Sequence, residues 1–213
     1  MSESHTPHAG LSARNLVCER GGRTLFSSLS FDLAPGDALI LRGPNGSGKT
    51  SLLRLLAGLL PAAGGEILWR GEPVQKDREV WRGALRFLAH DNAVKPALTV
   101  EQNLAFWIRL YDDASGDGLN RGLSAMGLER LVDLPAAMLS AGQRRRLALS
   151  RLAACPGNVW LLDEPTVTLD ADSVTRLSRM VADHRDEGGM VIAATHDTFD
   201  MPGARHVDLG DTA

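Results

Sequence analysis

The eight residues at positions 43–50, GPNGSGKT, constrain this chain more than any others, because they fit the phosphate-loop pattern G-x-x-x-x-G-K-[ST] without a mismatch. An apolar run of strand type, 38–41, precedes them, and leucines at helical spacing follow from Leu52 to Leu59. The pattern predicts a glycine-rich loop between a buried strand and a helix N-terminus. Converging backbone N–H groups and the positive end of a helix dipole bind phosphates in such a loop.

We therefore expect a nucleoside triphosphate site. Lys49 would reach the β- and γ-phosphates, and the Thr50 hydroxyl would be a Mg²⁺ ligand. A glycine-rich turn with a chance lysine is the alternative, and the strand before and helix after the loop disfavour it. The candidate ATP-binding residues of the loop are Gly43, Pro44, Asn45, Gly46, Ser47, Gly48, Lys49, Thr50 and Ser51.

Composition narrows the class of protein. The 213 residues suffice for one large domain with a real core, and 44% apolar with 23% charged residues is ordinary for a globular protein. A formal net charge of -3 weakly disfavours nucleic-acid binding. Cys18 and Cys155 lack metal-ligand spacing, which favours buried thiols. We expect no secretory signal in 1–10. We also expect no membrane span, since the most apolar window, 52–63, is too short to cross a bilayer. A partner would supply any membrane part.

The order of apolar patterns predicts an α/β fold. Strand-like runs occupy 11–18, 24–33, 38–41, 66–69, 85–89, 159–162 and 190–194, and helical patterns occupy 103–111, 119–134, 140–154 and 171–187. Thr99 to Gln102 resembles a capping box. We expect a polar tail at 1–10 and a single domain at 11–213. This domain would combine a parallel nucleotide-binding core, a small antiparallel β part at the front, and an inserted helical subdomain at about 99–154.

Two adjacent carboxylates follow a buried strand in the run VWLLDE, 159–164. Ligands of open α/β sheets bind at the carboxyl ends of the strands. Asp163 would hold Mg²⁺ directly or through water, and Glu164 would be the general base for the water that attacks the γ-phosphate. A solvated acidic turn is the alternative, and the phosphate loop upstream makes it the minority interpretation.

The pentapeptide LSAGQ, 139–143, precedes a long helical pattern. A serine with small residues at a helix N-terminus can bind a second anion. An ordinary serine N-cap explains Ser140 equally well if the pentapeptide is taken alone.

The motifs together resemble those of the ATP-binding cassette (ABC) family of ATPases. The chain contains GPNGSGKT, LSAGQRRR, which is one residue from the LSGGQ signature, WLLDEP, then Thr168-Leu169-Asp170 and Thr195-His196, in the family's order. The resemblance implies a head-to-tail dimer, with each ATP between the phosphate loop of one chain and the signature of the other: Leu139, Ser140, Ala141, Gly142 and Gln143. It further implies that Asp170 contacts the partner and that His196 contacts the γ-phosphate.

Two positions depart from the family's pattern. Where an aromatic residue usually stacks on adenine, this chain has Arg20, whose guanidinium can also stack on a base. Where a glutamine usually touches Mg²⁺ and water, it has His90, whose neutral imidazole can accept from water or bind a metal. We count both as candidate site residues. We expect the arginine run 144–146 to be a solvated helix face.

Within the family, the segments around His90 and the signature resemble the ATP-binding subunits of bacterial cytochrome c maturation, also called haem exporters. This resemblance implies a peripheral protein on the cytoplasmic face of the inner membrane, bound to an integral permease through a surface at 90–107. Val94, Lys95, Leu98, Phe106 and Trp107 are the candidate contacts there, although Phe106 and Trp107 could instead fill the core. Another cargo, such as lipoprotein release or efflux, and a soluble non-transport ATPase acting on ribosomes or DNA remain alternatives. We expect no nucleic-acid partner.

Overall fold

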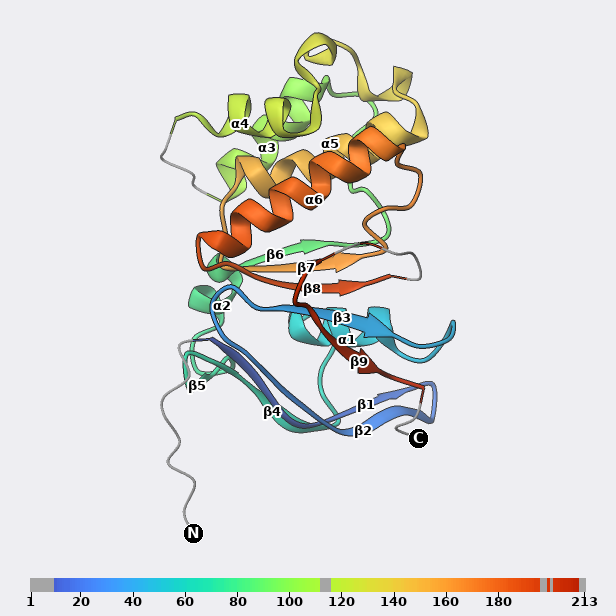
Figure 1. Ribbon diagram of the computed structural model, residues 1–213, viewed down its shortest axis with the longest axis vertical. Helices are drawn as coiled ribbons and strands as arrows, with labels where there is room; N and C mark the ends of the chain where they lie inside the picture. Colours follow the sequence, from blue (N-terminus) through green and yellow to red (C-terminus); the bar gives the residue numbers. More distant parts are fainter. Residues whose placement is uncertain (1–9, 112–115, 196–198, 200, 211–213) are drawn as a thin grey trace.

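The computed structural model describes residues 10–111, 116–195, 199 and 201–210, and it places helix α1 (Lys49–Leu56) between two β-sheets. One sheet is antiparallel and the other, called the second sheet below, is parallel. A group of helices covers the face of the parallel sheet that points away from α1 (Figure 1). The layered α/β architecture predicted from the sequence is confirmed.

The second sheet is parallel, with the strand order β6-β7-β8-β3-β9. These strands are β6 (Leu85–Leu88), β7 (Val159–Asp163), β8 (Met190–Ala194), β3 (Ala38–Arg42) and β9 (Arg205–Asp208). In β3, Leu39 and Leu41 enter the core on the α1 side, whereas Ala38 and Ile40 enter the core on the helical side. Continuous apolar runs therefore mark strands that are buried on both faces. Strand β9 was not predicted from the sequence. It lies at the edge of the sheet, is mostly exposed, and contains only one apolar residue, so it lacks the apolar pattern of a buried strand.

The first sheet is antiparallel, with the order β2-β1-β4-β5. It contains β1 (Leu11–Arg20), β2 (Arg23–Leu33), β4 (Gly64–Trp69) and the short β5 (Glu72–Pro73). This confirms the predicted antiparallel part at the front of the chain. Helix α2 (Arg78–Ala84) was not predicted; Asp77 caps it by accepting from the Val80 N–H at 3.0 Å.

Helices fill the chain between β6 and β7, as expected. They are α3 (Val100–Leu110), α4 (Gly118–Met126), α5 (Ala141–Ala154) and the short 3-10 turns η1 (Glu129–Leu131) and η2 (Ala136–Met138), while α6 (Ala171–Asp186) connects β7 to β8. Thr99 with Gln102 forms the predicted capping box at α3. The helix predicted to run from 119 to 134 is wrong in its extent, because Gly127 at φ 63° ends α4 in the left-handed conformation.

The helices share a core with the parallel sheet. One apolar cluster joins Leu104 of α3 and Leu123 of α4 to Leu162 of β7 and Val191 of β8. The bounds of a helical subdomain at about 99–154 thus stay a prediction. Within the described part of the chain, no helix has both the length and the apolar character needed to cross a membrane.

Candidate nucleotide-binding site

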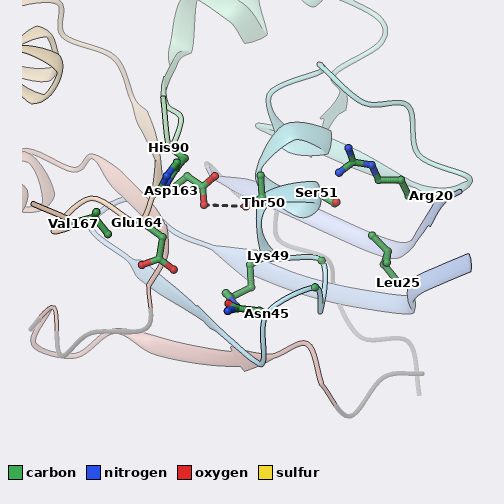
Figure 2. A pocket seen from close by; sticks show the side chains of 12 residues that line it. Arg20, Leu25, Asn45, Lys49, Thr50, Ser51, His90, Asp163, Glu164 and Val167 are labelled. Carbon is green, nitrogen blue, oxygen red and sulfur yellow. Dashed lines mark hydrogen bonds between the residues drawn. The ribbon is translucent and has the colours of Figure 1, made fainter. Parts of the chain in front are cut away.

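A cleft of about 640 Å³ opens at the carboxyl ends of the parallel strands, beside the N-terminus of α1. It is lined by Arg20, Leu25, Asn45, Gly46, Gly48, Lys49, Thr50, Ser51, His90, Asp163, Glu164 and Val167. Figure 2 shows Arg20 and Leu25 at one end, Glu164 and Val167 at the other, and Lys49 and Thr50 between them. The fold therefore brings the phosphate loop, the acidic pair and both departing positions, Arg20 and His90, to one cleft.

The phosphate loop needs its glycines. Gly43, Gly46 and Gly48 have φ values of 134°, 85° and 103°, which side chains disfavour. A Cβ on Gly43 would lie 2.7 Å from Ser47 Oγ. Lys49 is 7% exposed, and its Nζ donates to the carbonyls of Gly43 at 2.7 Å and Pro44 at 3.1 Å. The loop thus folds around the lysine ammonium.

Ser47 indicates that this loop suits an anion. Its Oγ is buried and has no hydrogen-bond partner among the residues that the structure describes. Buried polar groups nearly always have a partner, so a group of this kind needs an explanation. A phosphate oxygen accepting from this hydroxyl, in a loop that leads into the N-terminus of α1, satisfies it.

Asp163 and Thr50 meet across the cleft floor. The Thr50 hydroxyl donates to Asp163 Oδ1 at 3.1 Å, and Asp163 is 3% exposed (Figure 2). Within the described ranges, no group of three or more His, Cys, Asp or Glu side chains could hold a metal. One hydroxyl and one carboxylate nevertheless suit Mg²⁺, which usually takes one or two carboxylates and completes its shell with phosphates and water.

Glu164 follows directly in an unusual backbone conformation. Its φ is 46°, and its N–H donates to the carbonyl of Ala194 at 2.8 Å. The side chain is half-buried in the cleft wall, whereas those of His90 and Arg20 are exposed at the cleft. His196, the other predicted catalytic residue, lies outside the described residues; the buried Thr195 precedes it.

The signature segment 139–143 lies elsewhere on the surface. Ser140 caps α5: its Oγ accepts from the Gln143 N–H at 3.1 Å, and Gln143 Oε1 accepts from the Ser140 N–H at 2.8 Å. Leu139 is buried, but Ser140 and Ala141 are exposed. Among described residues, none of these five lines the cleft of its own chain. Ser140 is therefore an N-cap, and it is also open to a second molecule.

Gly142 of the signature lies against the segment that leads to Asp170. A Cβ on Gly142 would lie 2.9 Å from the Thr168 carbonyl oxygen. Asp170 is exposed and caps α6 by accepting from the Ser173 N–H at 2.8 Å. Hydrogen bonding from the Ser173 side chain, and then from its backbone N–H, lowers the pKa of Asp170. The signature and Asp170 thus share one face of the chain.

The interpretation of 144–146 as a solvated helix face is wrong for Arg145. This residue is 3% exposed, because it lies on the side of α5 that faces the cleft loops. Its Nη2 donates to the carbonyls of Asp163 at 2.9 Å and Glu164 at 2.6 Å, and its Nη1 donates to those of Ala89 at 3.2 Å and His90 at 3.3 Å. Sequence reasoning missed it, since nothing distinguishes it from the arginines on either side.

Comparison with known proteins identifies the family. Residues 26–167 match the ABC transporter family. The chain belongs to the ABC transporter family. A relative in Paramagnetospirillum magneticum, named cytochrome c biogenesis ATP-binding export protein CcmA, is 49% identical over 95% of this chain and 94% of its own. The protein of the same name in Pseudomonas putida strain KT2440 is 45% identical over 95% of this chain and 98% of its own.

Solved ABC structures share the fold. A putative ABC transporter ATP-binding protein from Pyrococcus furiosus superposes with a TM-score of 0.80 at 24% identity, over 93% of this chain and 96% of that chain. The cbiO1 protein of Clostridium perfringens, part of the ABC transporter complex cbiONQ, superposes with a TM-score of 0.75 at 26% identity, over 89% and 79%. The predicted ABC ATPase of the cytochrome c biogenesis type is confirmed at the level of the family.

Proposed function

We propose that this chain is the ATP-hydrolysing subunit that powers a membrane complex of cytochrome c biogenesis, in which haem is exported or handled. The cleft that gathers the phosphate loop, Asp163, Glu164 and His90 carries this proposal, because it supplies a phosphate cradle, a cation site and a base. The relatives named for cytochrome c biogenesis, at 45% and 49% identity over 95% of the chain, support the assignment of the cargo system.

Each side chain then has one task. The backbone N–H groups of 45–50 and the Lys49 ammonium would bind the phosphates, and Arg20, exposed at the far end of the cleft, would lie against the adenine ring. Thr50 and Asp163 would hold Mg²⁺, which would offset the charge of the phosphates. Glu164 accepts a proton from the attacking water, and His90 and His196 position the water and the γ-phosphate.

Two chains complete each site. Ser140 to Gln143 are absent from the described lining of their own chain's cleft, and Ser140 and Ala141 are exposed. In a head-to-tail dimer, the N-terminus of α5 from one chain would meet the triphosphate in the other chain's loop. Asp170, on the same face as Gly142, would contact the partner across this interface.

A test of the site changes Glu164 to Gln. This substitution keeps the shape of the side chain but removes the proton acceptor, so hydrolysis should slow by roughly 10²–10⁴-fold. Binding of ATP should persist, because the phosphate loop is unchanged. Steady-state phosphate release and equilibrium binding of a fluorescent ATP analogue measure the two effects.

The same variant tests the cargo system in cells. Deletion of the gene should abolish c-type cytochromes and spare b-type ones, and the wild-type gene should restore them while the Glu164→Gln gene should not. Undiminished turnover of Glu164→Gln would remove Glu164 from its role. Normal c-type cytochromes in the deletion strain would instead reject the cargo assignment alone.

We place the permease contact on the face of α3. Phe106 is 39% exposed with Lys95 Nζ 4.0 Å from its ring centre, and the exposed Leu110 continues this surface. Trp107 is half-buried instead, with Arg151 4.5 Å from its ring centre. Asn103, which is 4% exposed, holds the preceding loop by donating to the carbonyls of residues 95, 98 and 99. An apolar anchor on a helix whose preceding loop is fixed suits a helix of an integral partner at the cytoplasmic face of the inner membrane.

Replacing Phe106 by Ser should weaken this docking. Co-purification with the permease from detergent-solubilised membranes should fall several-fold, because an exposed aromatic anchor is lost. Val80→Ser is the matched control, since Val80 is 56% exposed on α2, away from this surface. If Phe106→Ser and Val80→Ser both co-purify with the permease at the wild-type level, this docking face is rejected.

A further inference from the structure

Arg145 joins two loops of the nucleotide cleft to the helix that carries the signature. It lies on α5, three residues after Gly142. Besides the four carbonyls already described, its Nε donates to the carbonyl of Pro165 at 3.2 Å, and its Nη1 donates to Asn92 Oδ1 at 3.0 Å. One rigid guanidinium therefore fixes the backbone of 163–165 and the backbone of 89–92 relative to each other.

The backbone that Arg145 holds is the strained part of the cleft. Glu164 has a φ of 46°, and such a conformation in a non-glycine residue costs about 1–3 kcal/mol unless its surroundings enforce it. Three hydrogen bonds support it here: Arg145 and the Val167 N–H donate to the Glu164 carbonyl at 2.6 and 3.4 Å, and the Glu164 N–H donates to the Ala194 carbonyl at 2.8 Å. Without the guanidinium, the backbone of 163–165 would lose this hydrogen-bonded connection to residues 89 and 90, and the strained Glu164 would be held less firmly in the cleft.

Two nearby carboxylates and several carbonyl oxygens compensate for the burial of the Arg145 charge. Desolvation lowers the pKa of Arg145, and the carboxylates of Asp163 and Glu164 counteract that effect. A guanidinium stays protonated even so, and all its partners named here are carbonyl oxygens. Hydrocarbon of similar size would remove the guanidinium donors from these buried carbonyls, so the site favours an arginine.

We propose that Arg145 is a positioning residue for ATP hydrolysis, which acts by holding Glu164 and His90 in register on either side of the attacking water. It touches neither nucleotide nor water itself. This inference rests on the proposed ATPase reaction and on Glu164 as its base. It predicts that loss of Arg145 affects the chemical step and spares the binding of ATP.

The test compares substitutions at two buried arginines of α5 in the full chain. Arg145→Gln should lower kcat by roughly 10–100-fold, the usual effect of losing a group that orients a catalytic side chain. KM for ATP, and the Kd for ATP without Mg²⁺, should change by less than about threefold, because the phosphate loop is untouched. The kcat of Arg145→Lys should lie between those of the wild type and Arg145→Gln, since an ammonium keeps the charge but cannot span both loops.

Arg151→Gln is the matched control. Arg151 is also buried on α5, at 6% exposed, but it donates to the Phe87 carbonyl at 2.8 Å and stacks on Trp107, away from the cleft. The Arg151→Gln protein should be less stable than the wild type but keep its kcat per folded molecule, with the folded fraction measured by circular dichroism. If Arg145→Gln does not fold, the kcat of Arg145→Lys against this control decides.

Three results would overturn the proposal: wild-type kcat in the Arg145 variants, a loss of kcat no greater than in Arg151→Gln, or a parallel loss of ATP affinity. Glu164→Gln is assayed beside them. If Glu164→Gln is inactive while Arg145→Gln is normal, only the role of Arg145 fails. If Glu164→Gln is fully active, the proposed reaction fails instead.

Discussion

At the scale of single residues, three consecutive arginines have three different environments. Arg144 donates to the Leu139 carbonyl, Arg146 donates to the Met126 carbonyl at 3.2 Å, and Arg145 enters the cleft wall. Successive helical residues point about 100° apart, so only the packing of α5 decides which one is buried. The sequence pattern around position 145 contains no information on that choice.

His184 gives the residue scale a prediction about pH. Its ring stacks on Trp160, with centroids 3.8 Å apart and planes 3° apart, and burial lowers the pKa of His184 to about 4. The unfolded chain would bind this proton near the ordinary value of about 6.5. Between these two values the unfolded state holds more protons, so the folded state loses stability as the pH falls.

We therefore expect His184 to make the protein about 2 kcal/mol less stable at pH 5 than at pH 7. His184→Asn removes this group, so its stability should depend less on pH over that range. Urea denaturation at both pH values measures the difference. An identical dependence in the two proteins would show that the folded histidine titrates normally.

At the scale of elements, a glycine determines how closely α4 packs against two neighbouring helices. Gly122 of α4 faces α3 and α5: a Cβ there would lie 2.8 Å from Leu104 Cδ2, 2.9 Å from Ala154 Cβ and 2.9 Å from the Ser150 carbonyl oxygen. Gly83 of α2 has no such neighbours within 4 Å. Alanine is intrinsically the better helix former at both positions.

The two glycines should consequently respond with opposite signs. Gly122→Ala should cost about 1–3 kcal/mol, because the extra methyl group forces the helices apart. Gly83→Ala should stabilise the protein by about 0.5–1 kcal/mol through helix propensity. Chemical denaturation measures both, and a stabilising Gly122→Ala would contradict the close packing of α4.

Predictability from sequence also differs among the elements. Strands β3, β7 and β8 were predictable because burial on both faces requires continuous apolar runs. Helices α3 and α5 were predictable because a capping box precedes α3 and a serine N-cap precedes the helical pattern of α5. Strand β9 was not predictable, because it forms only by pairing with another strand of the sheet, and helix α2 was not, because a single capping residue marks its start. Local patterns also could not show that Gly127 would end α4.

At the scale of the whole molecule, the cleft residues come from four separated parts of the chain. Motif spacing predicted that the phosphate loop, Asp163 and Glu164 would converge, because the carboxyl ends of parallel strands lie at one edge. The resemblance to the ABC family added His90 and Arg20. Only the structure could show that Arg145 links these loops, since its contacts depend on how α5 packs on the sheet.

The central claim is that each ATP site is completed by a second chain. Lys49→Ala removes the phosphate-loop cation, and Ser140→Arg blocks the signature at the exposed N-terminus of α5. Each variant alone should lack activity, because every site in its homodimer carries the lesion. In a mixed dimer, both lesions fall on one site and the other site is intact.

The decisive measurement is the ATPase activity of an equimolar mixture of Lys49→Ala and Ser140→Arg chains, compared with each variant alone and assayed with the membrane complex present. The head-to-tail arrangement predicts that hydrolysis returns on mixing and disappears again when Glu164→Gln is added to the Ser140→Arg chain, which supplies the intact phosphate loop. A mixture that stays inactive, while wild-type chains mixed with either variant remain active, would contradict it.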